Sequence, residues 1–431
     1  MKFPFTCIAS SLLLVAAAPA ENLLVIGDSL SKEYQVEYAG IGGNLSAAHV
    51  RNWCEILDAR RSASFSMGNF GSHADWRLVG HDYNWSIPGS FAADWRDYLD
   101  SASTTPDDLV SQLRNNVDRV VVWLGGNDIR SRYGDFYDGG STVAWIDKVE
   151  SDIKFVVEWV RSQNPDIPMV MAGVPHVGCT PSKSEAHPYD PVKTGRVTAA
   201  LDTLNARLKS YALRRGLGWA DTYGMTRELV TASRWVIGGY RVEKVASSSG
   251  DPDALFMGDG FHPNWPAQAV FAQRFVNAFN ERYGMRLPRL TNREIVKDVL
   301  GEDADLSLSQ WTQGYAIPSG DRGFADDPDG DRIKNIVEFA LDLDPTRPDT
   351  QLLPQPYVAR INGLDYLSLT WQARDPDNNT FALVTPQEST LLGGWTTVPG
   401  IAQGANYSRT VRKRLNAGPR GFLRLQATHI P

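Results

Sequence analysis

Serine, aspartate and histidine occur in this sequence in short clusters that could support nucleophilic catalysis. Ser29 follows the apolar run 23–26, in the string Gly27-Asp28-Ser29. A short apolar run that enters a tight turn presents the serine hydroxyl at the carboxyl end of a strand, where open α/β sheets carry out their chemistry. A serine hydroxyl is a poor nucleophile by itself. The chain must therefore also supply a base and hydrogen-bond donors for an oxyanion.

The candidate base is His262, in the segment 259–262 (Asp-Gly-Phe-His). His262 would take the proton of the Ser29 hydroxyl and return it to the leaving group, while Asp259 would hold the imidazole in the required tautomer. An aspartate three residues before a histidine can do this where both lie in a loop that curls back on itself. Taken singly, Ser29 is better explained as a turn or cap residue, and the other two as a surface turn. Together they predict a catalytic triad.

Two further segments lie between the serine and the histidine. Residues 84–89 (Asn-Trp-Ser-Ile-Pro-Gly) offer a glycine in a turn, and residues 125–128 (Gly-Gly-Asn-Asp) follow a strand-like run. The order and spacing of the four blocks strongly resemble the SGNH, or GDSL-type, hydrolases. The resemblance covers roughly residues 21–284.

The resemblance implies an oxyanion hole made of three donors: the backbone N–H groups of Ser29 and Gly89, and the side-chain amide of Asn127. Glycine suits its place because the backbone must approach the substrate closely. An asparagine amide donates hydrogen bonds without bringing a charge. The resemblance further implies hydrolysis of carboxylic esters through an acyl-enzyme intermediate, with no cofactor for catalysis.

The substrate stays open at this stage. The chain could be a lipase-like esterase, a carbohydrate O-deacetylase or a thioesterase of the same family, with a small-molecule, glycan or lipid ester as substrate. An alternative of another class is a surface or polysaccharide-binding protein that uses the SGNH domain as a scaffold. The intact catalytic blocks argue against that alternative. A net charge of −7 without a basic stripe argues against nucleic acid as a partner. The sequence does not determine the oligomeric state.

The pattern of elements predicts two kinds of structure along the chain. Strand-like runs at 23–26, 119–124, 168–172 and 217–220 alternate with helical stripes. This alternation favours a three-layer, flavodoxin-like α/β fold with a mainly parallel sheet. Later in the chain, period-two patterning and turn clusters predict a small β-sandwich-like domain. The expected divisions are a signal peptide (1–20), a catalytic domain (21–287), a linker (288–350) and a β-rich module (351–431).

Residues 1–20 have the pattern of a secretory signal. Lys2 gives the positive start, residues 7–17 the apolar stretch, and residues 18–20 (Ala-Pro-Ala) the cleavage site. We therefore expect a secreted or periplasmic protein, with no transmembrane segment, because no apolar run is long enough to span a bilayer. Cys54 and Cys179 could form a disulfide or stay as two buried thiols.

An acidic segment in the expected linker has the spacing of an EF-hand-like calcium loop. Residues at positions 1, 3, 5, 9 and 12 of such a loop carry oxygen ligands. Position 6 is Arg332, where a glycine is expected for the sharp turn. A structural calcium ion and a solvated acidic turn are both compatible with this pattern. With the β-rich end, the segment resembles C-terminal modules of exported proteins from Verrucomicrobia-like bacteria. The candidate metal ligands are Asp327, Asp329, Asp331, Asn335 and Glu338.

Overall fold

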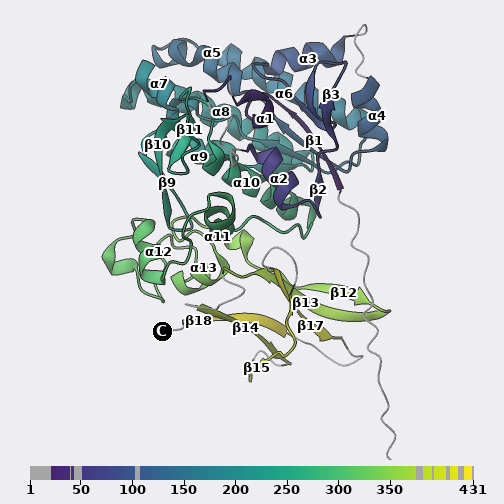
Figure 1. Cartoon of the computed structure of the whole chain (residues 1–431), viewed down its shortest axis with the longest axis vertical. Coiled ribbons are helices and arrows are strands. Elements are labelled where there is room, and N and C mark those ends of the chain that lie inside the picture. The colour runs from purple at the N-terminus through teal and green to yellow at the C-terminus, as the bar shows by residue number, and fades with distance from the viewer. Residues whose placement is uncertain are drawn as a thin grey trace, which may run out of the picture.

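The computed structural model describes residues 21–38, 40–42, 51–101, 107–374, 382–390, 393–403, 408–415 and 422–429. The expected signal peptide at residues 1–20 lies outside the described residues. An α/β unit and a pair of β-sheets lie at opposite ends of the molecule (Figure 1). Between them lie three short helices: α11 (Asn292–Glu294), α12 (Leu308–Gly314) and α13 (Asn335–Leu341).

A parallel sheet forms the centre of the α/β unit. Its strands lie in the order β2-β1-β6-β7-β8, and β5 also pairs with β1. All of these pairings are parallel. The strands are β1 (Glu21–Gly27), β2 (Phe65–Ser66), β5 (Asn84–Ser86), β6 (Arg119–Trp123), β7 (Met169–Ala172) and β8 (Gly218–Ala220).

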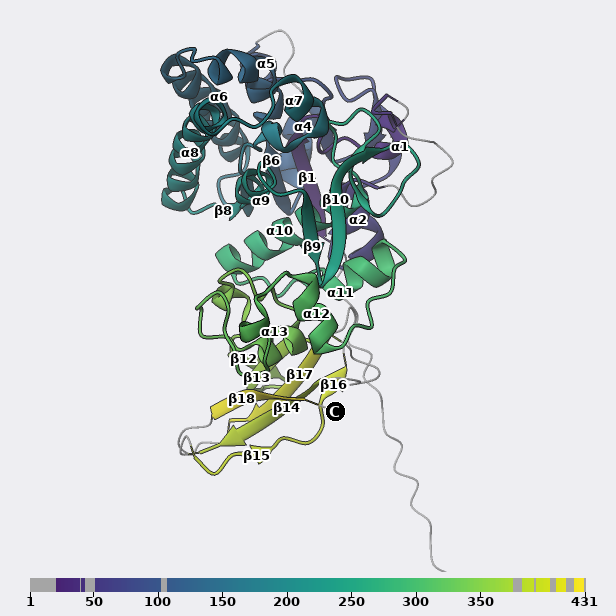
Figure 2. The same cartoon turned by 90° about the vertical axis from the view of Figure 1, so that its left-hand side faces the viewer.

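Both faces of this sheet are covered by helices, which explains why its strands read as continuous apolar runs. Along β1, Leu24 and Ile26 belong to one core, and Leu23 and Val25 to the other. Figure 2 shows helices on both sides of β1 and β6. The first core contains residues of α3 (Ala92–Asp100), α4 (Asp107–Asn115), α5 (Gly126–Tyr137), α6 (Val143–Gln163) and α8 (Pro191–Arg214), and the second those of α2 (Trp53–Arg60) and α10 (Trp265–Tyr283).

The predicted α/β fold with a mainly parallel sheet is confirmed. The sequence patterns missed a second sheet, in the order β11-β10-β9, and a small hairpin of β3 and β4. Strand β11 is parallel to β10 and leads directly into residues 259–262. The remaining elements of this unit are β3 (Phe70–Ser72), β4 (Val79–His81), β9 (Arg234–Ile237), β10 (Tyr240–Ser247), β11 (Ala254–Met257), α1 (Tyr34–Glu37), α7 (Pro181–Ala186) and α9 (Thr222–Glu228).

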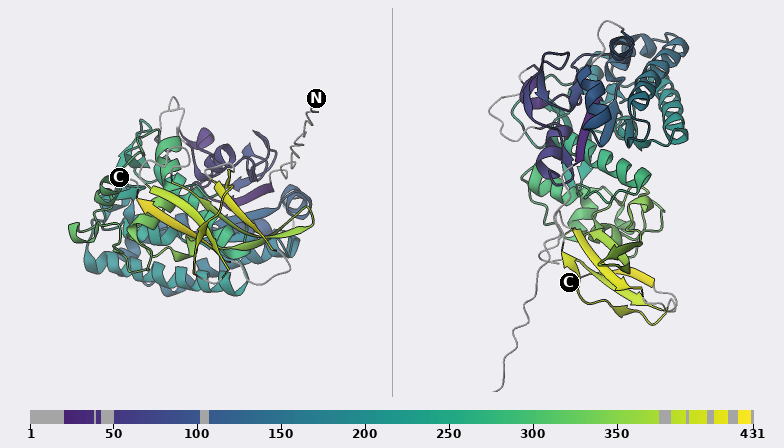
Figure 3. Two further views of the ribbon diagram at one scale, coloured as in Figure 1. Left: turned by 90° about the horizontal axis from the view of Figure 1, so that it is seen from below. Right: turned by 90° about the vertical axis from the view of Figure 1, so that its right-hand side faces the viewer.

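The C-terminal region contains two antiparallel sheets, as its period-two pattern predicts. One has the order β12-β13-β17-β16 and the other β15-β14-β18. Side chains of both sheets meet in one apolar core around Trp371 and Val411. Figure 3 shows these strands from below. They are β12 (Tyr357–Ile361), β13 (Leu364–Gln372), β14 (Ala382–Ser389), β15 (Thr396–Thr397), β16 (Ala402–Gln403), β17 (Ser408–Arg414) and β18 (Phe422–His429).

The segment that begins the expected linker packs closely on the α/β unit. Leu290 and Ile295 are fully buried in the same core as α2 and α10. The guanidinium of Arg61 donates two hydrogen bonds to the carboxylate of Glu294, at 2.7 and 2.5 Å, and both side chains are buried. The division of the chain at residue 287 stays a prediction. These contacts tie the first part of the linker to the α/β unit.

The two cysteines within the described residues do not pair. Cys54 and Cys179 are both free and buried. Of the two interpretations left open by the sequence, the structure shows the buried thiols.

Within the part of the chain that the structure describes, no helix has the length and apolar character needed to cross a membrane.

The packing of residues 290–305 gives a test of where the α/β unit ends. A chain that stops after Arg289 lacks Leu290 and Glu294, and it leaves Arg61 buried without its carboxylate. Removing one partner of a buried ion pair costs about 3–5 kcal/mol. We expect this chain to melt well below one that stops after Asp305, as measured by circular dichroism. Equal melting temperatures would contradict this and favour the boundary at residue 287.

Candidate active site

Three adjacent parallel strands bring the first three sequence blocks to one edge of the sheet. Strand β1 lies between β5 and β6, and Gly27 is in register with Ser86 on one side and Trp123 on the other. The carboxyl ends of the three strands are therefore level. The residues just beyond them, Ser29, Gly89 and Asn127, consequently gather at the same edge.

The structure brings Ser29, His262 and Asp259 into a continuous hydrogen-bonded chain. His262 Nε2 lies 2.8 Å from Ser29 Oγ, and His262 Nδ1 lies 2.5 Å from Asp259 Oδ2. Ser29 and His262 are separated by 233 residues in the sequence. This is the geometry of a nucleophile beside a base, with the base oriented by a carboxylate.

Asp259 is fixed within its own loop. Its Oδ1 accepts hydrogen bonds from the backbone N–H groups of Phe261 (2.9 Å) and His262 (3.0 Å). Partial burial raises the pKa of Asp259, but the hydrogen bond and charge of His262, together with these N–H donors, lower it below its ordinary value overall. The carboxylate therefore stays ionised beside the imidazole, as an orienting acid must.

Two backbone donors at the site are free. The N–H groups of Ser29 and Gly89 have no hydrogen-bond acceptor among the residues that the structure describes. Gly89 has a φ of +78°, which L side chains rarely adopt, and no heavy atom lies within 4 Å of where a Cβ would be. The amide of Asn127 donates to the carbonyl of Ser90 at 3.1 Å. An amide has two N–H bonds, so Asn127 has a second donor to offer.

The turn after β1 is held by a dense set of buried polar contacts. The carbonyl of Ser31 accepts hydrogen bonds from the amides of Asn52 (2.8 Å) and Asn84 (2.9 Å). The indole of Trp53 donates to Ser31 Oγ at 3.0 Å, and that of Trp95 donates to the carbonyl of Gly27 at 3.1 Å. Buried backbone groups need partners. These contacts satisfy two carbonyls of the turn and fix its shape.

Gln268, on α10, links the nucleophile turn to the histidine loop. Its side chain donates to the carbonyl of Leu30 at 3.3 Å and to the hydroxyl of Tyr34 at 2.8 Å. The Tyr34 hydroxyl in turn donates to the carbonyl of Pro263, next to His262. Gln268 is fully buried. The sequence pattern places it on a helix but gives no signal of this role.

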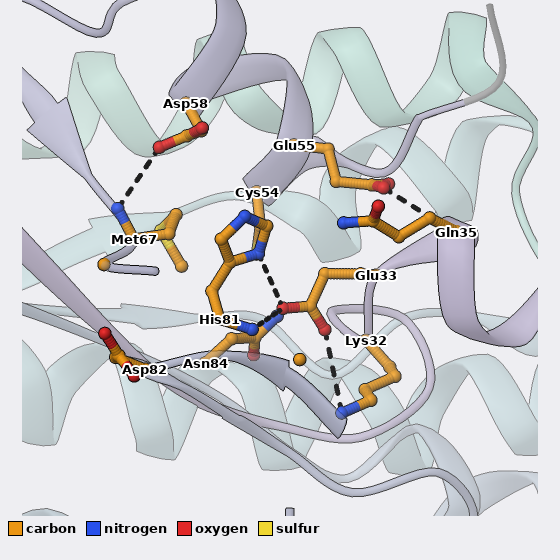
Figure 4. Close-up of polar contacts among 12 residues, drawn as sticks. Lys32, Glu33, Gln35, Cys54, Glu55, Asp58, Met67, His81, Asp82 and Asn84 are labelled. Carbon is orange, nitrogen blue, oxygen red and sulfur yellow. Dashed lines mark hydrogen bonds and ion pairs between the residues drawn. The ribbon is translucent and has the colours of Figure 1, made fainter. Parts of the chain in front are cut away.

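A buried cluster of charged residues lies directly after the nucleophile turn. Glu33 accepts hydrogen bonds from the backbone N–H (2.8 Å) and the ring Nδ1 (3.0 Å) of His81, and its other oxygen lies 3.7 Å from Lys32 Nζ (Figure 4). Burial raises the pKa of Glu33, but His81 and Lys32 lower it overall. Burial lowers the pKa of His81, whereas the hydrogen bond and charge of Glu33 raise it overall. The cluster joins the turn to the strand β4.

Asp28 and Asp128 lie next to the catalytic positions and accept backbone hydrogen bonds. Asp28 Oδ1 accepts from the N–H of Leu30 at 2.9 Å, and Asp128 Oδ2 from the N–H of Ala92 at 3.0 Å. Burial raises the pKa of Asp28 to about 7 and that of Asp128 to about 6.

The aromatic residues next to the catalytic blocks belong to the apolar cores. Trp85 is fully buried, and Trp265 nearly so.

The structure also brings together three of the five candidate metal ligands, which lie far from this site in the sequence. Oxygens of Asp327, Asp329 and Asp331 all lie within 4.8 Å of one another. Glu338 and Asn335 are fully buried on α13. The charge of a further carboxylate, that of Asp349, raises the pKa of Glu338. Asp349 was not among the predicted ligands. Its place in a separate loop explains why the spacing pattern missed it.

Comparison with known proteins identifies the family. The model of the GDSL-like Lipase/Acylhydrolase family matches residues 25–270, which is more than half of the 431 residues. The matched range contains all four catalytic blocks. No curated protein was found to match the chain.

Several solved structures are similar to part of this chain. An extracellular lipase from Streptomyces rimosus is 16% identical, with a TM-score of 0.35, and the match covers 61% of this chain and 100% of the lipase. A carbohydrate esterase family 3 protein from Talaromyces cellulolyticus is 12% identical, with a TM-score of 0.33, covering 59% and 94%. A possible lipase from Chitinophaga pinensis is 14% identical, with a TM-score of 0.37, covering 60% and 98%. At such low TM-scores, nothing about activity follows from these similarities.

The contact between Glu33 and His81 gives a stability that depends on pH. Because the pKa of His81 is raised, its contribution is complete below about pH 6.5 and is lost as the pH rises through the raised value. Because the pKa of Glu33 is lowered, its contribution is complete above about pH 4.5 and is lost as the pH falls. His81→Gln should therefore lower the melting temperature most between these values and less at about pH 9.

A matched control for this measurement is His187→Gln. The ring of His187 lies against Tyr133 and Tyr137, and it has no carboxylate partner among the described residues. Melting curves of the two variants and the wild type across this pH range make the comparison. A loss in His81→Gln that is the same at every pH would contradict the charge-based account.

Proposed function

This chain belongs to the GDSL-like lipase/acylhydrolase family and is an ester hydrolase, and we propose that it cleaves carboxylic esters through an acyl-enzyme formed on Ser29. The observation that carries this proposal is the chain of hydrogen bonds from Ser29 through His262 to Asp259. The free N–H groups of Ser29 and Gly89 support it further. A scaffold that only binds would need neither feature.

In the first half of the reaction, Ser29 Oγ attacks the carbonyl carbon of the ester while its proton moves to His262 Nε2. The carbonyl oxygen becomes an oxyanion and accepts hydrogen bonds from the N–H groups of Ser29 and Gly89 and from the amide of Asn127. Asp259 stabilises the imidazolium that forms. The intermediate collapses by breaking the carbon–oxygen bond to the alcohol. His262 then gives its proton to the leaving alkoxide.

In the second half, water replaces the alcohol. His262 takes a proton from the water, and the resulting hydroxide attacks the acyl carbon of the Ser29 ester. The same donors stabilise the second oxyanion. The intermediate then collapses, the bond between the acyl carbon and Ser29 Oγ breaks, and His262 returns the proton to Ser29. The products are one carboxylic acid and one alcohol, and the enzyme is regenerated without any cofactor.

The mature chain begins after Ala20 and acts outside the cytoplasm, as a secreted or periplasmic enzyme. The pattern of residues 1–20 supports this, with Lys2 followed by an apolar stretch and small residues. Expression of the full chain in a bacterium, followed by N-terminal sequencing of the exported protein, should give Glu21 as the first residue. Retention of residues 1–20 on protein that stays in the cytoplasm would contradict the proposal.

Substitutions at the site should have graded effects on the hydrolysis of p-nitrophenyl acetate. Ser29→Ala should lower kcat by about 10⁴-fold or more, because it removes the nucleophile. Asn127→Ala should lower kcat by roughly 10²–10³-fold, because it removes one oxyanion donor. Ser162→Ala is the control, since this exposed serine on α6 lies outside the site. Melting curves of all three variants check the fold. Near-normal kcat in Ser29→Ala would refute the mechanism.

A further inference from the structure

The acidic loop at residues 327–331 holds the carboxylates of Asp327, Asp329 and Asp331 close together. Asp327 Oδ1 and Oδ2 accept backbone hydrogen bonds from Gly330 and Arg332, each at 2.9 Å, and Asp331 Oδ1 accepts one from Ile333 at 2.7 Å. These bonds fold the loop, but they do not neutralise its charge. A group of exposed aspartates could be explained as a solvated turn. The residues packed behind this loop are not exposed.

Glu338 is fully buried next to the loop and has no hydrogen-bond partner. Neither of its carboxylate oxygens is paired among the residues that the structure describes, and the same is true of the buried Oδ2 of Asp329. The charged groups that act on Glu338 most strongly are the carboxylates of Asp349, Asp329 and Asp331. An unpaired buried carboxylate among like charges is costly unless a cation joins it.

Asp349 reaches the cluster from outside the loop. Its backbone N–H donates to Asp331 Oδ2 at 2.9 Å, and its own Oδ2 accepts from the N–H of Asp344 at 3.0 Å. Its other oxygen, Oδ1, is buried and without a partner among the described residues. Asn335 shows the same feature: its amide nitrogen donates to two backbone carbonyls, while its Oδ1 is buried and unpaired.

We propose that this cluster binds one calcium ion, and that Asp349 is a ligand in addition to the five residues predicted from the sequence, Asp327, Asp329, Asp331, Asn335 and Glu338. Every candidate ligand is an oxygen, as a hard cation requires. Calcium accepts six to eight oxygens in flexible geometry, whereas magnesium prefers a tighter octahedron with several waters. A site with several converging carboxylates fits calcium better.

Arg332, at the position where a glycine is expected, does not prevent the loop from forming. Its φ is +75°, so the backbone adopts the left-handed conformation that glycine would supply. Its side chain is exposed. The cost of this conformation for a residue with a side chain is about 1–2 kcal/mol. The sequence therefore departs from the calcium-loop pattern in residue type, while the backbone keeps the required turn.

The proposed ion would also link the segment 342–352 to α13, because Asp349 lies in this segment and Glu338 lies on the helix. Two residues before Asp349 in this segment, Arg347 forms an ion pair with Glu228 of the α/β unit. Asp342 accepts a hydrogen bond from the backbone N–H of Arg293 at 2.8 Å and one from Arg374 at 2.9 Å. Calcium would thus stabilise the contact between the C-terminal region and the α/β unit.

The test is calcium titration of the full chain by isothermal calorimetry after treatment with a chelator. The wild type should bind one equivalent of calcium, and magnesium should bind at least about tenfold more weakly. Glu338→Gln and Asp349→Asn should each weaken calcium binding at least about tenfold. Asp365→Asn is the matched control, because this exposed aspartate lies on β13 of the same region, and its binding should equal that of the wild type.

Melting curves keep the proposal falsifiable if a variant folds poorly. In chelator, Glu338→Gln should melt at or above the wild type, because an amide cannot carry a negative charge beside the neighbouring carboxylates. Added calcium should raise the melting temperature of the wild type but not that of Glu338→Gln. Absence of calcium binding by the wild type, or wild-type affinity in Glu338→Gln, would overturn the site. Wild-type affinity in Asp349→Asn would overturn the role of Asp349, and equal affinity for magnesium would overturn the choice of calcium.

Discussion

The hydrogen bond between Ser29 and His262 depends on holding together two segments from different sheets. One is the turn after β1, and the other is the loop after β11. Buried polar side chains link the two segments and supply the constraint. Asn52 fixes the first segment, and Gln268 with Tyr34 joins it to the second. Because these groups are buried, loss of one partner leaves another unsatisfied. The precision of the triad therefore comes from polar residues that do not touch the reacting atoms.

The same electrostatic constraint is met in two different ways in this molecule. Glu33 is buried, but Lys32 and His81 lie beside it, and its pKa is lowered. Glu338 is equally buried, but its charged neighbours are carboxylates such as Asp349, and its pKa is raised. A buried charge needs a partner of opposite sign or a change of protonation state. The first glutamate has its cations within the chain. The second is surrounded mainly by acidic groups, so it stays protonated at neutral pH unless the proposed calcium ion joins it.

Local patterns could place the candidate site residues at strand ends. The apolar runs before Ser29 and Asn127 predict two strands of a parallel sheet, whose carboxyl ends lie at one edge, and the family resemblance supplied the expectation that the two residues work together. The long-range polar contacts could not be predicted. Gln268 lies on α10. The apolar periodicity of this helix indicates which of its faces is buried, but it does not indicate that Gln268 donates a hydrogen bond to the carbonyl of Leu30, 238 residues away. Asp349 was missed for a related reason, since a loop pattern covers only its own twelve positions.

Residues 288–350 are expected to form a linker, and the structure shows how its first part, around Leu290 and Glu294, packs on the α/β unit. Charged side chains in this segment are used in buried pairs, such as that of Glu294 with Arg61, rather than in contacts with water. A hydropathy scale predicts that such charged residues are exposed, because it takes no account of an oppositely charged partner elsewhere in the sequence. The segment therefore acts as a packed layer between the two ends of the molecule. Arg347 pairs with Glu228 of the α/β unit, and the backbone N–H of Asp349 donates to Asp331 of the acidic loop. Apolar contacts join the layer to both ends as well, because Val236 of β9 and Ala382 of β14 pack around one cluster that contains Trp311. The position of the C-terminal sheets therefore depends on polar and apolar contacts of this layer together.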